Sequence, residues 1–120
     1  MVPSQRFDQV LAWQKAHALV LRIYAATRGF PREERFGLSS QMRRAAVSVP
    51  ANIAEGYKRR GRADKIRCLN IAQASLEELR YYLILGRDLN YLEAYEEIHS
   101  ELDEASRLLA GYIAGIENRG

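Results

Sequence analysis

Hydrophobic residues recur along the chain at the three- and four-residue intervals of amphipathic α-helices, in four segments separated by Gly, Pro and Asn. No segment alternates between apolar and polar residues over the length of a strand. The pattern therefore predicts an all-α protein, and four helices with short connections favour an up-down-up-down four-helix bundle. The expected helices span residues 8–29, about 34 or 36 to 60, about 63–87 and about 92–116.

The second segment has one apolar face and one polar face along its whole length. The apolar positions are Leu38, Met42, Ala45, Val49, Ile53 and Gly56, and the polar ones are Arg44, Ser48, Glu55 and Arg59. Pro50 lies inside this segment, where it removes a backbone N–H and crowds the carbonyl of Ala46, so we expect a kink. Two shorter helices broken at Pro50 are the alternative. One bent helix is favoured because the apolar positions keep their phase across the proline.

The other segments show where helices begin, end and face the core. Asp8 is the expected N-cap of the first helix, Gly29 and Pro31 end it, and residues 88–91 form a short turn before the last. The third segment has an unusually wide apolar arc, which predicts burial against more than two neighbours. The expected core positions are Val10, Trp13, His17, Val20 and Tyr24; then Cys68, Leu69, Ala72, Ser75, Leu76, Leu79, Tyr82 and Leu83; and Tyr95, Ile98, Leu102, Ala105, Leu109, Tyr112, Ile113 and Ile116.

Length and composition place the chain among small one-domain proteins. Its 120 residues suffice for one hydrophobic core, so we treat residues 1–120 as a single domain. No apolar run approaches 18 residues, and the N-terminus lacks the layout of a signal peptide. The single cysteine, Cys68, is expected to be a small buried residue. A reducing, cytoplasmic location without membrane contact fits these features.

Charge is distributed unevenly along the chain, although the net charge is only +3. Residues 28–67 contain eleven Lys and Arg against four Asp and Glu, a balance of +7. Residues 91–120 contain seven acids against two arginines, a balance of −5. Such a two-sided molecule is suited to an anionic ligand on one side, or to contacts between copies of itself.

The basic stretch is the candidate functional site. Clustered Arg and Lys release counterions from a phosphate chain and need no sequence motif to do so, which favours RNA or DNA binding. A solvated basic helix end is the alternative, because cations are favourable at a helix C-terminus. The candidate nucleic-acid-binding residues are Arg43, Arg44, Lys58, Arg59, Arg60, Arg62, Lys65 and Arg67.

Residues that suggest catalysis or metal binding have simpler interpretations. Ser48, Asn52 and Glu55 lack a histidine base, so we expect Ser48 and Asn52 to bond backbone groups near Pro50, and Glu55 to pair with an arginine. His17 is expected to be packed and His99 to be at the surface, with no Glu-x-x-His pair to form a di-metal site. We therefore expect no enzyme activity, no cofactor and no metal.

Several motifs carry a family resemblance. Residues 41–56 (QMRRAAVSVPANIAEG), the Trp13–Ala16 motif, Phe30-Pro31 and residues 71–79 closely resemble the four-helix-bundle proteins encoded in intervening sequences of bacterial large-subunit ribosomal RNA genes. That superfamily includes the accessory variability determinant proteins of diversity-generating retroelements. The resemblance implies a four-helix bundle that assembles into a ring-shaped homopentamer with a basic surface. In the retroelement branch it also implies a reverse transcriptase and its RNA as partners.

The combined hypothesis is a non-enzymatic, nucleic-acid-binding accessory protein that acts as a homo-oligomer. The retroelement and ribosomal-insert branches stay open at this point, as does the choice between RNA and DNA. The alternative is a structural or protein-interaction scaffold whose basic surface contacts an acidic protein.

Overall fold

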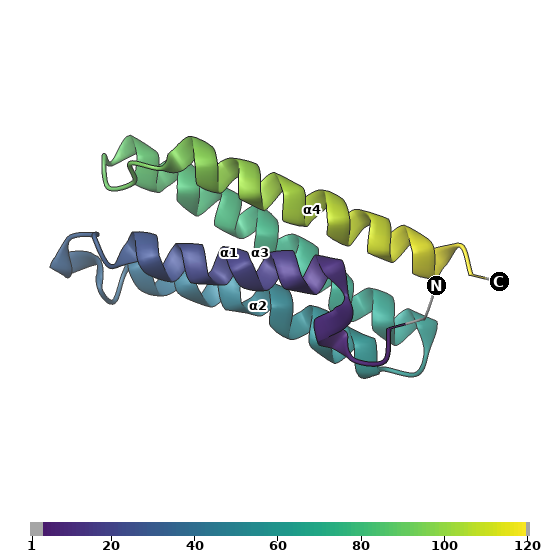
Figure 1. Cartoon of the computed structure of the whole chain (residues 1–120). Helices are drawn as coiled ribbons and strands as arrows, with labels where there is room; N and C mark the ends of the chain where they lie inside the picture. Colours follow the sequence, from purple (N-terminus) through teal and green to yellow (C-terminus); the bar gives the residue numbers. More distant parts are fainter. Residues whose placement is uncertain (1–3, 120) are drawn as a thin grey trace.

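The computed structural model describes residues 4–119 and is built from helices alone (Figure 1). The four α-helices are α1 (Leu11–Thr27), α2 (Leu38–Lys58), α3 (Arg62–Asp88) and α4 (Tyr95–Glu117). Two short 3₁₀ turns, Phe7–Gln9 and Arg32–Glu34, precede α1 and α2. Within the described residues there is no strand, so the predicted all-α class and the number of long helices are confirmed.

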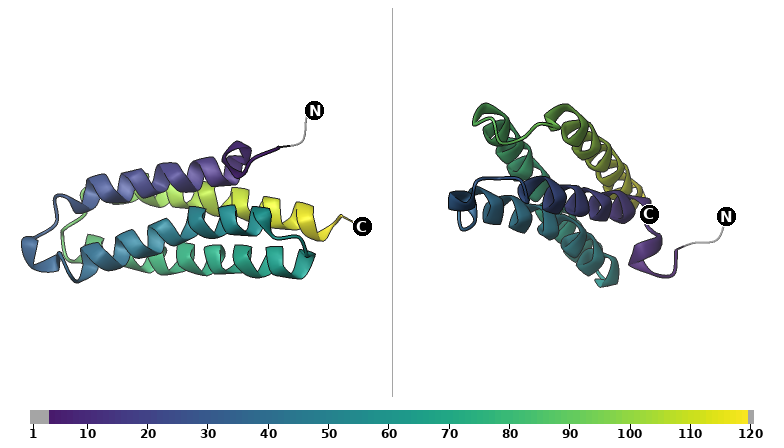
Figure 2. Two further views of the ribbon diagram at one scale, coloured as in Figure 1. Left: turned by 90° about the horizontal axis from the view of Figure 1, so that it is seen from below. Right: turned by 60° about the vertical axis from the view of Figure 1, so that its left-hand side comes forward.

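Consecutive helices run in opposite directions and lie side by side along a molecule of 49 × 24 × 20 Å (Figure 2). Helices that follow one another in the chain pack together, and α1 also packs against α4, which closes the four-helix arrangement. The most extensive packing is between α2 and α3. Because of this topology, the α2–α3 turn lies at the same end of the bundle as the start of α1 and the end of α4 (Figure 1).

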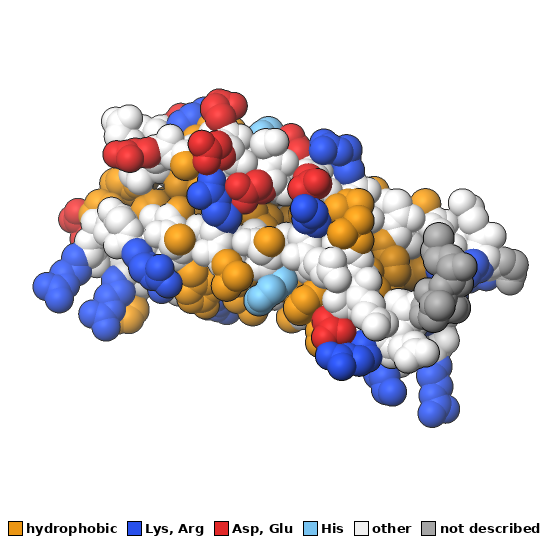
Figure 3. Space-filling view, in the orientation of Figure 1, with side chains coloured by type: hydrophobic (Ala, Val, Ile, Leu, Met, Phe, Trp, Pro, Cys, Tyr) orange, Lys and Arg blue, Asp and Glu red, His pale blue; other side chains and the backbone are white. Residues whose placement is uncertain are grey.

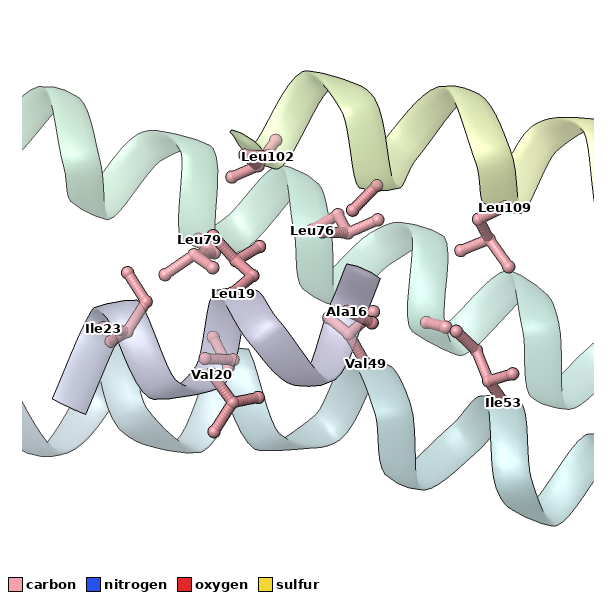
Figure 4. Packing of buried hydrophobic residues seen from close by; sticks show 14 of the residues in the cluster. Ala16, Leu19, Val20, Ile23, Val49, Ile53, Leu76, Leu79, Leu102 and Leu109 are labelled. Atoms are coloured by element: carbon pink, nitrogen blue, oxygen red, sulfur yellow. The ribbon is translucent and has the colours of Figure 1, made fainter. Parts of the chain in front are cut away.

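One hydrophobic core runs along the axis of the bundle, and all four helices contribute to it (Figure 4). The side chains that meet there are mostly Leu, Ile and Val, and many are completely buried. Removal of this apolar surface from water is the main source of stabilisation in a protein of this size. The largest fully buried side chains are Leu19, Ile23, Met42, Val49, Ile53, Leu69, Leu76, Leu79, Leu83, Ile98, Leu102 and Leu109.

The first helix differs most from the prediction. It begins at Leu11 with Val10 as its N-cap, whereas Asp8, the expected cap, lies within the preceding 3₁₀ turn. Its core face is formed by Ala12, Ala16, Leu19, Val20, Ile23 and Thr27. Of the expected positions, Val10 and Val20 are buried, whereas Trp13 and Tyr24 are half-buried and His17 is exposed. The small Ala side chains let α1 approach its neighbours closely, so the aromatic residues cover the edge of the core.

The second helix is continuous from Leu38 to Lys58 and contains Pro50, so the alternative of two separate helices is wrong. All six residues of its predicted apolar face are buried. The helix is shorter at its start than expected, because Glu34 belongs to the 3₁₀ turn and its carboxylate accepts the Leu38 N–H at 3.1 Å. That bond satisfies one of the free N–H groups at the start of α2.

The third helix ends in a Schellman motif built on Asn90, which has a positive φ of 62°. The Tyr91 N–H donates to the Gly86 carbonyl at 2.9 Å, and the Asn90 N–H donates to the Arg87 carbonyl at 3.0 Å. This geometry confirms the predicted turn after Asp88. The fourth helix then begins at Tyr95, three residues later than the expected Leu92.

Ion pairs join the fourth helix to the first and third. Arg22 of α1 donates to Glu97 and Glu101 of α4, at 2.8 and 3.0 Å. Arg80 of α3 donates to Asp103 of α4 at 2.6 Å.

Acidic side chains gather over α4 in Figure 3, whereas basic side chains project near both ends of the lower pair of helices. The charge asymmetry of the sequence is thus also an asymmetry of the surface. No helix in the described chain has the length and apolar character needed to cross a bilayer.

Candidate nucleic-acid interface

The basic stretch of residues 28–67 does not form one surface in the folded chain. It includes all of α2, whose 21 residues separate its two ends by about 30 Å. Arg43 and Arg44 lie toward the start of α2, whereas the other six candidate residues surround the α2–α3 turn at the opposite end of the bundle. The predicted set therefore divides into two groups.

We call the larger group the basic end, defined as Lys58, Arg59, Arg60, Arg62, Lys65 and Arg67, together with Arg119. Lys58 and Arg60 are exposed, and neither side chain forms a hydrogen bond or an ion pair with any of residues 4–119. Arg59 donates to Glu55 at 2.6 Å, and this hydrogen bond raises the pKa of Arg59. Arg67 donates to Asp64 at 3.2 Å. Two of these cations are thus partly neutralised, whereas Lys58 and Arg60 keep their full charge toward solvent.

Lys65 has a structural role within the basic end. Its ammonium donates to the backbone carbonyls of Tyr57 at 2.8 Å and Gly56 at 3.3 Å. These are among the last carbonyls of α2, which lack the usual N–H partner four residues later, and the Gly56 carbonyl also accepts the Arg59 N–H at 3.2 Å. A cation at this position also interacts favourably with the negative end of the helix dipole. Lys65 therefore connects the start of α3 to the end of α2.

A hollow of about 540 Å³ opens in the basic end between the ends of α2 and α4 and the start of α3. Four cations line it: Arg60, Arg62, Lys65 and Arg119. The other lining residues are Tyr57, Tyr112, Ser4 and Ile116. The Arg62 guanidinium donates to the Arg119 carbonyl. Burial raises the pKa of Tyr112, and the positive charge of Arg119 opposes that shift.

Arg119 and Tyr112 were missed as site residues by sequence reasoning. Arg119 follows an acidic helix and is about 50 residues distant in sequence from the other cations of the basic end. Only the antiparallel return of α4 brings it there. The single sequence signal was its position at the very end of a helix, which in an up-down bundle meets the α2–α3 turn.

Arg43 and Arg44 lie in the second group and differ in their surroundings. Arg43 is half-buried: its Nε donates to the Thr27 hydroxyl at 2.8 Å, and its guanidinium lies 4.6 Å from the centre of the Tyr24 ring. These contacts connect α2 to α1. Arg44 is exposed on the outer face of α2, as its position on the helical wheel predicted.

The polar residues around Pro50 stabilise the contact between α2 and α3. The Asn52 amide donates to the Ser48 carbonyl at 2.8 Å and to the Ser48 hydroxyl at 3.1 Å. Ser75 of α3 donates to the same hydroxyl at 2.8 Å. The prediction that Asn52 bonds a backbone group near Pro50 is confirmed, and so is the pairing of Glu55 with an arginine, here Arg59.

The two histidines lie on separate elements. His17 stacks on Trp13 with a ring-to-ring distance of 5.0 Å, as expected of a packed side chain, but it is exposed, so its expected place on the core face of the first helix is wrong. His99 is half-buried rather than fully at the surface, and lies within 3.5 Å of Asp103.

Among residues 4–119, no three His, Cys, Asp or Glu side chains are grouped so as to hold a metal ion. Cys68 is buried, as predicted.

Fold and surface together define a small antiparallel four-helix bundle with a cationic end. The chain belongs to the 23S rRNA-intervening sequence protein family, whose sequence profile matches residues 8–111. It is also similar to a protein of unknown function from the S23 ribosomal protein family of Bacteroides thetaiotaomicron, solved by crystallography at 1.70 Å. The two share 32% sequence identity and superpose with a TM-score of 0.80, over 90% of this chain and 98% of that one. A search of curated proteins finds no match.

Proposed function

We propose that this protein is a non-enzymatic accessory protein that binds the phosphate backbone of RNA or DNA through its basic end. The observation that carries the proposal is the convergence of Arg60, Arg62, Lys65 and Arg119 around one open hollow. Four cations on so small a surface attract a chain of phosphates and release its counterions. Lys58 lies at the same end and has no acidic partner among the described residues.

The hollow fits backbone binding better than the reading of base sequence. Its cations lie on three helix ends that meet, and no helix projects from the bundle to enter a major groove. Tyr57 and Tyr112 add hydroxyl groups that can donate to phosphate oxygens. We therefore expect binding that depends strongly on salt and weakly on sequence.

The family resemblance supports a ring-shaped homopentamer as the active form. In such a ring the basic end is repeated five times, so that a long nucleic acid binds several weak surfaces at once. The acidic face of α4 and the basic surfaces of another copy supply complementary charges for a head-to-tail contact. A kink at Pro50 remains part of this proposal, because it would direct the basic half of α2 relative to its first half.

Two biological settings fit this proposal, and both place the protein in the cytoplasm. In the retroelement branch of the superfamily the protein would bind a reverse transcriptase together with its RNA. In the ribosomal-insert branch its gene would lie inside a ribosomal RNA gene. A neighbouring reverse-transcriptase gene with template and variable repeats would distinguish the first setting from the second.

A protein-interaction scaffold is the second candidate function. It is favoured by the exposed carboxylates of α4, such as Glu96, and by the exposed cations of the basic end, which form complementary surfaces on one molecule. Salt weakens both kinds of interaction, so salt dependence alone does not separate the candidates. Direct titration with nucleic acid does.

The test is fluorescence anisotropy with labelled 20-nucleotide RNA and DNA, at salt concentrations from 50 to 200 mM. We expect micromolar or tighter binding that weakens steeply with salt. In the double variant Lys58→Glu/Arg60→Glu, the slope of the logarithm of the binding constant against the logarithm of the salt concentration should be smaller in magnitude by about 1 to 2. Neither side chain has a partner within residues 4–119, so the variant should fold normally. Arg28→Glu/Arg107→Glu is the matched control, because both side chains are exposed, form no hydrogen bond or ion pair within residues 4–119 and lie outside the basic end. No binding at 50 mM salt by the wild-type protein would overturn the proposal.

A further inference from the structure

A second hollow, of about 660 Å³, lies at the opposite end of the bundle from the basic end. It is formed where the α1–α2 connection meets the first half of α2, and we call it the Phe36 hollow. Its size is that of a site for a small organic group. Its lining residues are Tyr24, Arg35, Phe36, Ser40, Arg43, Arg44, Val47 and Ser48.

Phe36 is the most unusual residue of this hollow, because 87% of it is exposed. It is the most exposed of the large hydrophobic residues in the described chain. The Arg35 guanidinium lies 5.2 Å from the centre of its ring and so covers one side of it. A phenyl ring that is open to solvent at the edge of a hollow presents a flat apolar surface for another ring.

Three arginines line the hollow together with this ring, and the donors of Arg43 and Arg44 are only partly used. Arg43 is held in place by its bonds to Thr27 and to the Tyr24 carbonyl, which leave at least three of its five N–H groups without an intramolecular acceptor among the described residues. Arg44 forms no hydrogen bond or ion pair with any of those residues. The site therefore offers Arg43, which two hydrogen bonds hold in place, and Arg44, which has no intramolecular partner among the described residues.

None of the described residues that line the Phe36 hollow carries a carboxylate. Glu34 lies two residues before Phe36 in the sequence, and its two carboxylate oxygens accept hydrogen bonds from the Leu38 N–H and the Tyr91 hydroxyl. On α3, Glu78 accepts the hydroxyl of Tyr82 at 2.7 Å. These carboxylates keep their charge but do not line the hollow, whereas three arginines do, so the lining itself is positively charged and favours an anionic ligand.

We infer that the Phe36 hollow binds one unpaired nucleotide of a single-stranded nucleic acid. The base stacks on the open face of Phe36, and the adjoining phosphates contact Arg43 and Arg44. A stacking aromatic beside backbone-binding cations is the combination by which proteins hold single strands, and every base has a flat face to stack. In a duplex the bases are already stacked on each other, so the hollow discriminates against paired nucleic acid.

The inference rests on the proposed function and adds the class of nucleic acid to it. The basic end supplies affinity for phosphate in either form of nucleic acid. The Phe36 hollow, at the other end of a molecule 49 Å long, adds a preference for unpaired bases. A strand that reaches both sites spans the length of the bundle.

The test compares oligo-dT, an abasic strand of the same length and a duplex, each titrated by anisotropy against the wild-type protein and the variant Phe36→Ala. We expect Phe36→Ala to weaken oligo-dT binding about 5- to 100-fold, which is the effect of losing one stacked base. Binding of the duplex and the abasic strand should be unchanged. Leu21→Ala is the matched control, since Leu21 of α1 is 58% exposed and lies outside the Phe36 hollow.

A second variant, Phe36→Trp, keeps a stacking ring and reports on it directly. We expect it to retain wild-type affinity, and its added fluorescence to be quenched by oligo-dT but not by the abasic strand. Binding of oligo-dT that Phe36→Ala leaves unchanged would overturn this inference and spare the proposed function. The absence of binding to any of the three probes by wild-type protein would overturn both. A lower mass of Phe36→Ala in light scattering, with unchanged strand preference, would instead assign Phe36 to a contact between copies.

Discussion

Gly56 of α2 lies directly against Cys68 of α3, so closely that a Cβ placed on Gly56 would come within 3.1 Å of the Cβ of Cys68. The same atom would lie 3.3 Å from the Lys65 carbonyl and 3.4 Å from Leu69. This close approach lies beside the basic end, where Lys65 bonds the last carbonyls of α2. The absence of a side chain at residue 56 thus allows the two helices to meet where the candidate site is built.

A larger residue at position 56 should therefore destabilise the bundle. We expect Gly56→Leu to lower the free energy of unfolding by about 1–3 kcal/mol, which is the usual cost of overpacking. Gly111→Leu is the matched control, because nothing lies within 4 Å of a Cβ at that position. There the better helix propensity of Leu should raise stability by about 0.5–1 kcal/mol. Urea unfolding monitored by circular dichroism measures both, and equal effects of the two substitutions would contradict the close packing.

Core charges should be far more damaging than surface ones. Ile53→Asp and Leu79→Asp each place a carboxylate at a position with no exposure, and we expect each to cost several kcal/mol and to unfold the chain. Gln41→Asp, at an exposed position of α2, should leave the helical circular-dichroism signal intact. A folded Ile53→Asp protein would show that the core is not arranged as described.

Two cations of the basic end should differ in their effect on stability. Lys65→Met keeps the aliphatic stem but removes both bonds to the α2 carbonyls, and we expect it to cost about 1 kcal/mol. Arg62→Ala removes an exposed side chain that bonds only the Arg119 carbonyl, so the melting temperature should change by less than about 2 °C. Scanning calorimetry gives both values. A large loss of stability in Arg62→Ala would show that this arginine is structural.

The ion pair between Arg80 and Asp103 should make stability depend on pH. The hydrogen bond from Arg80 holds the pKa of Asp103 below its ordinary value. The contribution of the pair is therefore fully present above the ordinary carboxylate pKa of about 4, and it is lost as the pH falls through the lower pKa of the folded state.

Substitution of Asp103 measures this contribution. We expect Asp103→Asn to lower the melting temperature at pH 7 by about 2–5 °C, and this difference to shrink as the pH falls below about 4. Glu93→Gln is the control, because Glu93 is exposed and forms no ion pair within residues 4–119. A difference between wild type and Asp103→Asn that does not shrink as the pH is lowered would mean that the side chain acts through packing and not through its charge.

We expect the protein to form a homo-oligomer, because the proposed function needs several basic ends in one particle. We expect light scattering at low micromolar concentration to give a multiple of 13.7 kDa, with five copies implied by the family resemblance. Ile71 is 46% exposed on α3 and belongs to a groove with Ile66 and Ala74, which marks this side of α3 as the expected contact between copies. Ile71→Asp should reduce the mass toward 13.7 kDa, whereas Leu21→Asp on α1 should not. A wild-type mass near 13.7 kDa would contradict the ring, and with it the argument that several copies bind one nucleic acid by avidity.

The hydrophobic pattern was enough to predict the class of fold, the number of long helices and most of the core. The apolar face of α2 was predicted residue by residue, because a helix of regular period with one apolar side has only one way to bury it. The face of α1 was predicted less well. There alanines occupy the core positions, and the aromatic residues that dominate a hydrophobicity pattern cover its edge.

The spatial grouping of the charges, in contrast, depends on how the helices pack. Along the sequence, residues 28–67 are one basic region, but the length of α2 carries its two halves to opposite ends of the bundle. The return of α4 brings Arg119 and Tyr112 to one of those ends, and the α1–α2 connection presents Phe36 at the other. Helical periodicity is a local property that neighbouring residues reveal. The grouping of cations around a hollow depends instead on where distant helix ends meet, which is fixed by the packing of the whole bundle.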